Sequence, residues 1–412
     1  GDSDTLVIST SHTLNSGDFT NVSGIETLEV ASDNMNVNIN NAATDITHID
    51  GTNATTLDVD ASTRVNGITV TGSAGIDTLT GGSGVDTLIG NAGDDTLIGG
   101  AGDSLLGGND DDVLSISGLA SALDGGAGID TLTVTSSGLD LSALDLSSLE
   151  NITLDTGGNS SVKLSQTDAS GSNLTGDGNT NTIEIDATAD LDLSAINNTN
   201  IDIFKVAATG GGALSITGSS VNDEITGSND QDNSYHFDNA NFSSSDTITG
   251  GTGTESIVFD DAMSQNITDF ANVSNVESIV GSSSADTFSL DFSNVNTFVF
   301  DGATGSDIVD ISTGIDVSGG DQSIADGSFK NIEQLNVDGA ITDGANTLNI
   351  TESNVDSWSD GANVLDLTVS NADVVSGNVK LVGTIGGDIT TTMTDNTTYS
   401  WADGTAITID IV

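Results

Sequence analysis

The stretch GGSGVDTLIGNAGDDTLIGG, residues 81–100, decides the fold of this chain. It holds two nine-residue units, each with glycines, an aspartate in the sixth place and a leucine two places later. Glycine tolerates the positive φ angles of a tight turn, and the in-phase leucine fits a strand whose alternate side chains face inward. The stretch therefore predicts a short strand and a tight turn in every nine residues.

The same unit recurs on both sides of this stretch. Five consecutive units begin at residues 72, 81, 90, 99 and 107, the fourth is one residue short, and a further unit covers residues 125–133. Their sixth-place aspartates are Asp77, Asp86, Asp95, Asp103, Asp112 and Asp130. Looser units begin at residues 218, 250, 281 and 302, and their acidic residues are Asp223, Glu255, Asp286 and Asp307.

A longer pattern pairs an acidic residue at the start of an apolar phrase with a glutamate further along the chain. The intervals are 22 residues from Asp4 to Glu26, 20 from Asp130 to Glu150, 22 from Glu255 to Glu277, and 26 from Asp307 to Glu333. Intervals of this length are typical of stacked repeats. We therefore expect similar supersecondary units that lie one on another.

These patterns predict an all-β fold, an elongated parallel β-solenoid or β-roll with glycine-aspartate loops. No segment has helical periodicity over two or more turns, and β-branched residues are frequent throughout. We expect one continuous body with blocks at residues 1–70, 71–134, 135–215, 216–310 and 311–412. Two nine-residue units would form one turn, which places Asp77 over Asp95 and Asp86 over Asp103.

Charge restricts the possible partners and the conditions of folding. The 412-residue chain has 62 acidic and 5 basic residues, for a formal net charge of −57. Self-repulsion of this size disfavours a compact state unless cations neutralise it, and such a chain is also typical of disorder without metal. Nucleic acid is excluded as a partner because no basic surface can form.

The sequence contains neither disulfide cross-links nor a membrane-spanning segment. There is no cysteine, so disulfides and thiolate metal sites are excluded. No apolar run reaches the roughly 18 residues that a membrane helix needs, so we expect no membrane insertion.

The oxygen donors of the repeated loop favour calcium. Glycine-rich backbone exposes carbonyl oxygens and the sixth-place aspartate adds a carboxylate, and calcium takes about six to eight such hard ligands. The sequence therefore predicts several bound Ca²⁺ ions.

The repeats resemble the repeats-in-toxin (RTX) family, whose GGxGxDxUx unit binds calcium in a β-helix. The resemblance implies that the six sixth-place aspartates named above are carboxylate ligands. It also implies carbonyl ligands at Gly81, Gly82, Gly84, Gly90, Gly99, Gly100, Gly107 and Gly108. Asp110 stands at the place of an expected glycine and is a further candidate ligand. Asp223, Glu255, Asp286 and Asp307 are either calcium ligands or ordinary turn residues.

The C-terminal part resembles large repeat adhesins and surface-layer proteins that leave the cell by type I secretion. The resemblance lies in NIEQLNVDGAITDGANTLNITESNV from residue 331 and in the final WADGTAITIDIV. That tail is either an export signal or a last edge strand. The resemblance implies a location outside a Gram-negative cell or on its surface.

An enzyme is not expected. His12, His48 and His236 are far apart in the sequence, and there is neither a GxSxG nor a GxxxxGK motif. Arg64 is the only arginine that could stabilise an acidic substrate.

The sequence thus predicts a secreted, calcium-binding structural protein that self-assembles into a surface layer, fibre or matrix. Its expected partners are copies of itself, with a cell-surface polysaccharide as a further partner. The alternative is the calcium-dependent C-terminal module of a large adhesin. A minor alternative is an ice-binding solenoid, suggested by TTTMTDNTT from residue 390.

Overall fold

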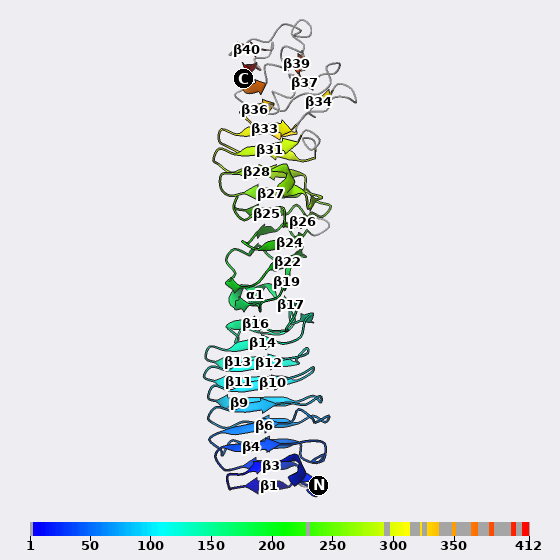
Figure 1. Ribbon diagram of the computed structural model, residues 1–412, viewed down its shortest axis with the longest axis vertical. Helices are drawn as coiled ribbons and strands as arrows, with labels where there is room; N and C mark the ends of the chain where they lie inside the picture. The colour runs from blue at the N-terminus through cyan, green and yellow to red at the C-terminus, as the bar shows by residue number, and fades with distance from the viewer. Residues whose placement is uncertain are drawn as a thin grey trace. The chain divides into compact units, whose positions relative to one another are not determined.

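The computed structural model (Figure 1) describes residues 3–227, 231–291, 297–313, 322–323, 328–337, 348–351, 364–369, 379–382, 397–400 and 406–411. The chain divides into two compact units. The first comprises Gly1–Asp186 and Ala195–Val206, and the second comprises Ala187–Ser194 and Ala207–Val412. Both are built from parallel strands, so the predicted parallel β-solenoid is confirmed in each. The five-block division of the chain stays a prediction.

The first unit contains two long parallel sheets, whose strands alternate along the chain. The first sheet has the order β1 (Thr5–Ile8), β3 (Thr27–Val30), β5 (His48–Asp50), β7 (Thr69–Thr71), β9 (Thr87–Ala92), β11 (Ser104–Asn109) and β13 (Ala122–Ala127). The second has the order β2 (Thr13–Leu14), β4 (Met35–Asn38), β6 (Leu57–Asp60), β8 (Thr78–Thr80), β10 (Thr96–Gly99), β12 (Val113–Ile116), β14 (Thr131–Val134), β16 (Asn151–Leu154), β18 (Asn173–Thr175) and β21 (Asn198–Thr199). A third run consists of β15 (Leu139–Asp140), β17 (Ser160–Leu164) and β19 (Asn181–Ala187), and β22 (Ile203–Ala208) lies where the two units divide.

Parallel pairing also prevails in the second unit, where one described pair, Thr397–Ser400 with Ala406–Ile411, is antiparallel. One sheet has the order β20 (Leu191–Asp192), β23 (Ser215–Thr217), β25 (Ser234–Phe237), β27 (Ser256–Phe259), β30 (Ser278–Val280), β32 (Val299–Asp301) and β35 (Phe329–Lys330). Another run is β24 (Asn222–Thr226), β26 (Thr247–Thr249) and β29 (Val273–Ser274). A third has the order β28 (Ser264–Asn266), β31 (Thr287–Asp291), β33 (Ile308–Thr313), β36 (Gln334–Val337), β38 (Val364–Val369), β41 (Ala406–Ile411) and β40 (Thr397–Ser400). A separate small sheet has the order β34 (Gln322–Ser323), β37 (Leu348–Thr351) and β39 (Val379–Val382).

The in-phase leucines of the repeats form the core of the first unit. Leu79 pairs with Leu97, Leu97 with Leu114, and Leu114 with Leu132, and each is 0 % exposed. Strand alternation turns every second side chain inward, so the nine-residue period stacks the same residue type turn after turn. The loop that follows each strand is thereby held in the same register as the loop of the next turn.

In the core of the second unit, phenylalanine takes the place of leucine at many positions. Phe242 packs against Phe237 at 5.1 Å and Phe270 at 4.9 Å between ring centroids, and Phe259 and Phe298 extend the cluster. Aromatic rings bury more area than leucine, which suits turns that lack the regular nine-residue spacing.

The described residues also include three short helices that were not predicted. They are α1 (Gln166–Gly171) and the 3-10 helices η1 (Ser16–Phe19) and η2 (Ile267–Phe270). Ser165 caps α1 by accepting a hydrogen bond from the Asp168 N–H. Among the described residues, no helix is long and apolar enough to cross a membrane.

The C-terminal predictions fall partly outside the described residues. Residues 338–347, 352–355 and 390–396, from the phrases at 331 and 390, are not among them. Within the tail, β41 is a strand that lies between β38 and β40. Ala406–Ile411 is therefore a strand, but the edge of this sheet is β40, so the tail is not the edge strand that was expected. The export signal stays a prediction.

Candidate metal centres

The sixth-place aspartates lie in the loops that immediately precede the strands, and all are buried. Their exposed fractions are at most 1 % for Asp77, Asp86, Asp95, Asp103, Asp112 and Asp130. Burial of a carboxylate is costly unless hydrogen bonds or a cation compensate it. The contacts of these side chains therefore decide what the loops can bind.

On one edge of the first unit, successive aspartates form a ladder of hydrogen bonds. The Asp77 N–H donates to Asp95 Oδ1 at 2.8 Å, the Asp95 N–H to Asp112 Oδ1 at 2.8 Å, and the Asp112 N–H to Asp130 Oδ1 at 2.7 Å. The predicted placement of Asp77 over Asp95 is thus confirmed. Each carboxylate uses one oxygen to join its own turn to the preceding turn.

The second oxygen of three of these carboxylates has no protein partner. Among the described atoms, Oδ2 of Asp95, Asp112 and Asp130 is buried and accepts no hydrogen bond. Burial, together with neighbouring acids, raises the pKa of Asp95 to about 7 and of Asp112 to about 6, and burial also raises the pKa of Asp130. Burial therefore disfavours the ionised form of these carboxyls, that of Asp95 most, and a bound cation would favour it.

Carbonyl oxygens of the next turn face the unpaired carboxylate oxygens. A Cβ added to Gly90 would meet both Asp95 Oδ2 and the Gly107 carbonyl, the latter at 2.5 Å. A Cβ added to Gly107 would likewise meet Asp112 Oδ2 and, at 2.5 Å, the Gly125 carbonyl. Only glycine fits at these positions, so no side chain separates the carboxylate oxygen from the carbonyl of the next turn, and both oxygens are the hard donors that calcium prefers. The residues present therefore fit a calcium ion.

The opposite edge has the same ladder but no unpaired oxygen. The Asp86 N–H donates to Asp103 Oδ1 at 2.8 Å, which confirms the second predicted stack. Here Oδ2 of each aspartate already accepts a hydrogen bond, from the Gly82 N–H and the Gly100 N–H at 2.6 Å. The two edges of the repeat block are therefore chemically different.

The predicted carbonyl ligands divide in the same way. The carbonyls of Gly90 and Gly107 lie beside the space next to an aspartate, and so does that of Gly125, which sequence reasoning missed. In contrast, a Cβ at Gly84 would meet the backbone of Asn66 and Gly67. For the other predicted glycines, Gly81 and Gly99 adjoin the Asp86 and Asp103 carboxylates, Gly82 adjoins Arg64 and Gly108 adjoins the Asn91 backbone.

Asp110 differs from the other candidate ligands. Its side chain is exposed, its φ is +73°, and its Oδ2 accepts a hydrogen bond from the Gly93 N–H at 3.1 Å. It lies at a loop surface and not in the buried ladder.

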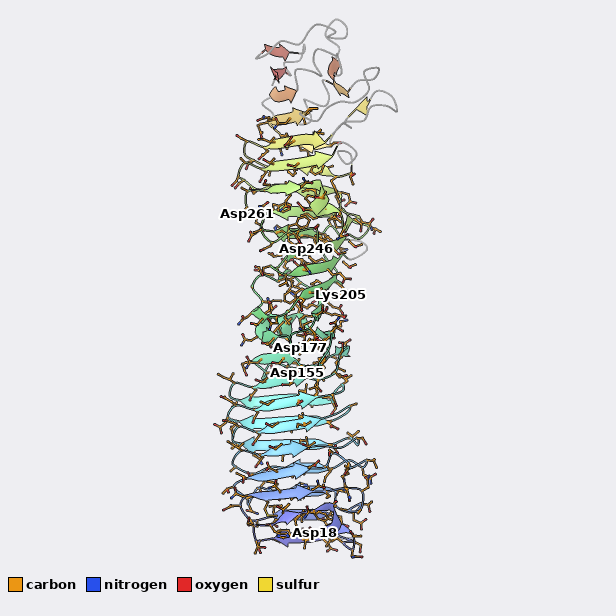
Figure 2. The ribbon with its side chains drawn as sticks, in the orientation of Figure 1. Asp18, Asp155, Asp177, Lys205, Asp246 and Asp261 are labelled. Atoms are coloured by element: carbon orange, nitrogen blue, oxygen red, sulfur yellow. The ribbon has the colours of Figure 1, made fainter. Side chains whose placement is uncertain are left out.

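The looser units have the same buried ladder. Asp223, Glu255, Asp286 and Asp307 are at most 1 % exposed, and the Asp286 N–H donates to Asp307 Oδ1 at 2.8 Å. The Asp223 N–H donates to Oδ1 of Asp246, which is equally buried and was not predicted. Asp246 is labelled in Figure 2. Asp246 follows a serine run and not a glycine, so a search for glycine-led units passes over it.

The four acid–glutamate pairs of the sequence are all in contact. Each glutamate accepts a hydrogen bond from the N–H of the paired acid, at 2.9 Å for Asp4 and Glu26, 2.8 Å for Asp130 and Glu150, 2.7 Å for Glu255 and Glu277, and 2.6 Å for Asp307 and Glu333. Glutamate therefore takes the ladder position of aspartate in these turns. The longer pattern is explained as one turn of the solenoid.

In the part of the chain that the structure describes, no three carboxylate, histidine or cysteine side chains converge on one point. Each loop instead offers one carboxylate with backbone carbonyls. The three histidines do not join the ladder, and His236 Nδ1 lies 3.0 Å from Asp260 Oδ1.

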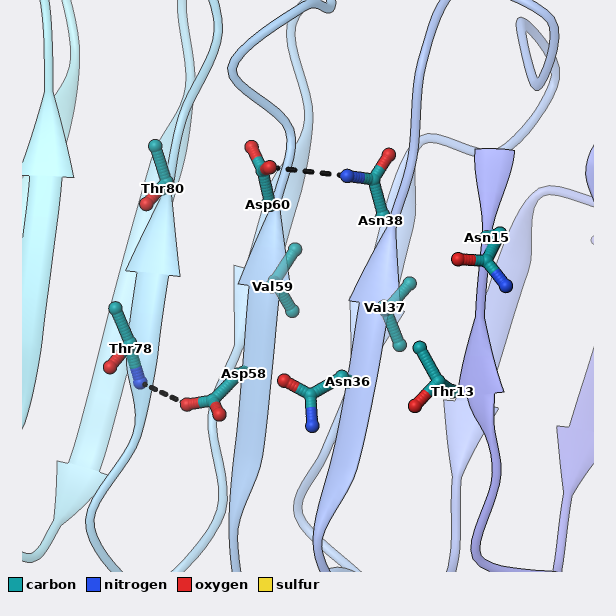
Figure 3. Close-up of a pocket in the computed structure, with 10 residues that line it drawn as sticks. All are labelled: Thr13, Asn15, Asn36, Val37, Asn38, Asp58, Val59, Asp60, Thr78 and Thr80. Atoms are coloured by element: carbon teal, nitrogen blue, oxygen red, sulfur yellow. Dashed lines mark hydrogen bonds between the residues drawn. The ribbon is translucent and has the colours of Figure 1, made fainter. Parts of the chain in front are cut away.

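A separate groove of about 560 Å³ lies on the outer face of strands β2, β4, β6 and β8 (Figure 3). Its outward side chains are polar, and Asn38 donates to Asp60 Oδ2 at 3.1 Å while the Thr78 N–H donates to Asp58 Oδ1 at 3.1 Å. The outward pairs on successive strands are Asn36 and Asn38, Asp58 and Asp60, Thr78 and Thr80, and Thr96 and Ile98. Threonine ranks are therefore not regular on this face.

Fold and loops together define a parallel β-roll with oxygen-lined turns. Residues 71–106 match the family model of the RTX calcium-binding nonapeptide repeat, in four copies. The repeats and the parallel solenoid fit the RTX β-roll family, so this is a calcium-binding repeat protein. No curated protein and no solved structure matches the chain in the other two comparisons.

Proposed function

We propose that this chain is a secreted structural protein whose solenoid is stabilised by several calcium ions. The observation that carries the proposal is the row of buried, unpaired oxygens on Asp95, Asp112 and Asp130, each near a carbonyl of the next turn, which belongs to Gly107, Gly125 and Ser148 respectively. Ions at these positions neutralise part of a net charge of −57. RTX repeats are typical of secreted proteins, which supports a location outside the cell.

Calcium should therefore couple to folding, because empty loops hold repelling carboxylates. Circular dichroism of protein treated with a chelator is expected to show reduced β-structure that returns when calcium is added. Strontium or magnesium at equal concentration serves as the comparison for ion size. A β-signal that the chelator leaves unchanged would contradict the proposal.

We also infer that copies of the chain associate at or outside the cell surface. Support comes from exposed apolar side chains in neighbouring loops of one edge, where Val65, Val85 and Leu119 are 60 %, 69 % and 49 % exposed. Val85 and Leu119 both border Gly102, since a Cβ there would contact Val85 and its N–H donates to the Leu119 carbonyl. Apolar stripes on an acidic surface are typical of interaction sites.

Electron microscopy and sedimentation with and without calcium test the association. We expect ordered assemblies in calcium and fewer of them for the variant Val85→Asp, with Ile129→Asp as a control on a different loop. Particles that stay monomeric at high concentration in calcium would favour the alternative, a calcium-dependent module of a larger adhesin.

A further inference from the structure

Apart from Asp86 and Asp103, whose Oδ2 atoms accept hydrogen bonds from glycine N–H groups, the buried ladder aspartates and Glu255 fall into two classes. In the first class, the residue after the leading position of the loop is a serine whose N–H and hydroxyl both donate to the carboxylate. The pairs, with N–H and hydroxyl distances, are Ser73–Asp77 (2.5 and 2.8 Å), Ser219–Asp223 (2.8 and 2.9 Å), Ser243–Asp246 (2.7 and 3.3 Å) and Ser282–Asp286 (2.8 and 3.4 Å). These carboxylates are solvated by the protein itself.

In the second class the serine is missing and one carboxylate oxygen is left without a partner. Within the described residues this class contains Asp95, Asp112 and Asp130 of the RTX block and, in the second unit, Glu255 and Asp307. Glu255 and Asp307 are both 0 % exposed. An unpaired buried carboxylate oxygen is too costly to keep without a cation or a proton.

Asp307 and Glu255 repeat the oxygen-lined space of the RTX block. A Cβ at Gly302 would lie 2.5 Å from Asp307 Oδ2 and would also meet the Asn331 carbonyl. A Cβ at Gly250 would lie 3.1 Å from Glu255 Oε2 and would meet the Asn275 carbonyl. As at Gly90, only glycine fits here, so no side chain separates the carboxylate oxygen from the carbonyl of the next turn.

A third kind of turn indicates what such carbonyls require. At the ladder position of β19, Asn181 is 0 % exposed, and its Nδ2 donates to the carbonyls of Asn179 at 2.7 Å, Asp177 at 3.2 Å and Asn200 at 3.2 Å. The amide supplies the positive end of a dipole at the centre of the loop. Where the ladder residue is an acid with a free oxygen, a bound cation, or a proton on the acid, would take this role.

We propose that the second unit holds two calcium-class divalent cations, one in the loop that ends at Glu255 and one in the loop that ends at Asp307. The serine-closed loops that end at Asp223, Asp246 and Asp286 hold none. Calcium fits better than magnesium because a carboxylate and a backbone carbonyl in an irregular arrangement suit its flexible coordination. The proposal rests on the calcium binding proposed for the RTX block, but it concerns loops outside residues 71–106.

Counting bound ions tests the proposal. Equilibrium dialysis against radioactive calcium gives the number of ions per chain for the full-length protein and for Glu255→Gln, Asp307→Asn and the double variant. Each single variant is expected to lose one ion and the double variant two. The matched control Asp286→Asn, in a serine-closed loop of the same ladder, should lose none.

The outcomes separate this proposal from the proposed function. If the unsubstituted protein binds no calcium, the proposed function fails and the second-unit sites fail with it. If that protein binds calcium but both variants keep every ion, or if Asp286→Asn loses one, the second-unit assignment is wrong and the RTX block is unaffected.

Hydrogen exchange of the unsubstituted protein guards against variants that do not fold. Calcium should slow amide exchange at residues 250–259 and 302–311 by tenfold or more relative to chelator, and should leave residues 219–226 less affected. Equal protection of the serine-closed and unpaired loops would overturn the division into two classes.

Discussion

Arg64, the one arginine of the chain, is only 1 % exposed. Its guanidinium donates to the carbonyls of Ala43 at 2.7 Å, Ile46 at 2.5 Å and Asn66 at 3.1 Å. It thus joins two successive loops immediately before the RTX block, through carbonyl oxygens. The Arg64 guanidinium is a positive charge that belongs to the chain itself, so this turn does not depend on dissolved ions.

The variant Arg64→Met should lower the free energy of unfolding by about 2–5 kcal/mol, because three buried carbonyls lose their donors. Urea unfolding should give a similar loss with calcium and with chelator. The control is Lys163→Met, whose exposed ion pair with Asp186 spans 2.6 Å and should contribute about 1 kcal/mol or less. An Arg64→Met loss confined to one of the two conditions would show that the arginine acts through the ions.

The calcium-free protein should lose stability as the pH rises from about 4 to about 7. Burial raises the pKa to about 7 for Asp95 and Asp223 and to about 6 for Asp112 and Asp307. A folded-state pKa above the unfolded value of about 4 favours folding below pH 4, and this contribution is lost as the pH passes the folded-state pKa. Melting temperatures in chelator should therefore be higher at pH 5 than at pH 8.

Saturating calcium should flatten this pH dependence, since the ion replaces the proton on the carboxylate. Asp95→Asn should weaken the dependence in chelator. A melting temperature in chelator that rises between pH 5 and pH 8 would refute the link to buried acids.

At the residue level, the acidic ligands could be predicted because glycine and aspartate recur together. The serines that close four of the loops could not be predicted, because a single serine forms no pattern in a chain rich in serine. Only the fold brings Ser73 or Ser219 against its acid. Asp246 was missed for another reason: its loop lacks the leading glycine that marks the other units.

Among the elements, strand β10 shows how the repeat separates core from surface. Leu97 is 0 % exposed and stacks between Leu79 and Leu114, whereas the adjacent Ile98 is 39 % exposed. Both residues are aliphatic and belong to one strand. Their different burial follows from strand alternation alone.

Leu97→Ala should lower the free energy of unfolding of the calcium-loaded protein by about 2–5 kcal/mol, because it leaves a cavity in the leucine stack. Ile98→Ala removes a similar volume from the surface of the same strand and should cost about 1 kcal/mol or less. Chemical denaturation of both variants measures the difference. Equal losses would mean that the register of β10 is not the one described.

The strands of the repeat block could be predicted because their period is constant. Helix α1 could not be predicted, since it depends on one serine cap. The phenylalanine cluster could not be predicted either, because Phe242, Phe259 and Phe270 follow no common spacing. These elements arise from tertiary packing, which overrides local pattern.

For the whole molecule, charge should dominate the behaviour without calcium. A net charge of −57 repels itself over a distance set by the Debye length, which is about 10 Å at 0.1 M salt and about 3 Å at 1 M. Sodium chloride should therefore raise the melting temperature in chelator more than in calcium. Sucrose of equal osmolality controls for effects unrelated to charge, and equal salt responses in the two states would contradict this expectation.

The parallel solenoid itself could be predicted from the repeats and the acid–glutamate intervals. Export and assembly depend on other molecules and on other copies of the chain. The stacking of turns within one chain specifies neither of them. The division into two compact units was also not predicted from the sequence, in which we expected one continuous body.

The constant register of the leucine stack also bears on how such a chain changes length over evolution. Leu79 and Leu97 occupy equivalent positions one turn apart, so the loss of the residues between them would bring one turn into the place of another. Unequal recombination within the repeat region of the gene would then yield shorter or longer proteins that still fold. Each such event would remove or add whole loops, and the number of ions carried would change in integral steps.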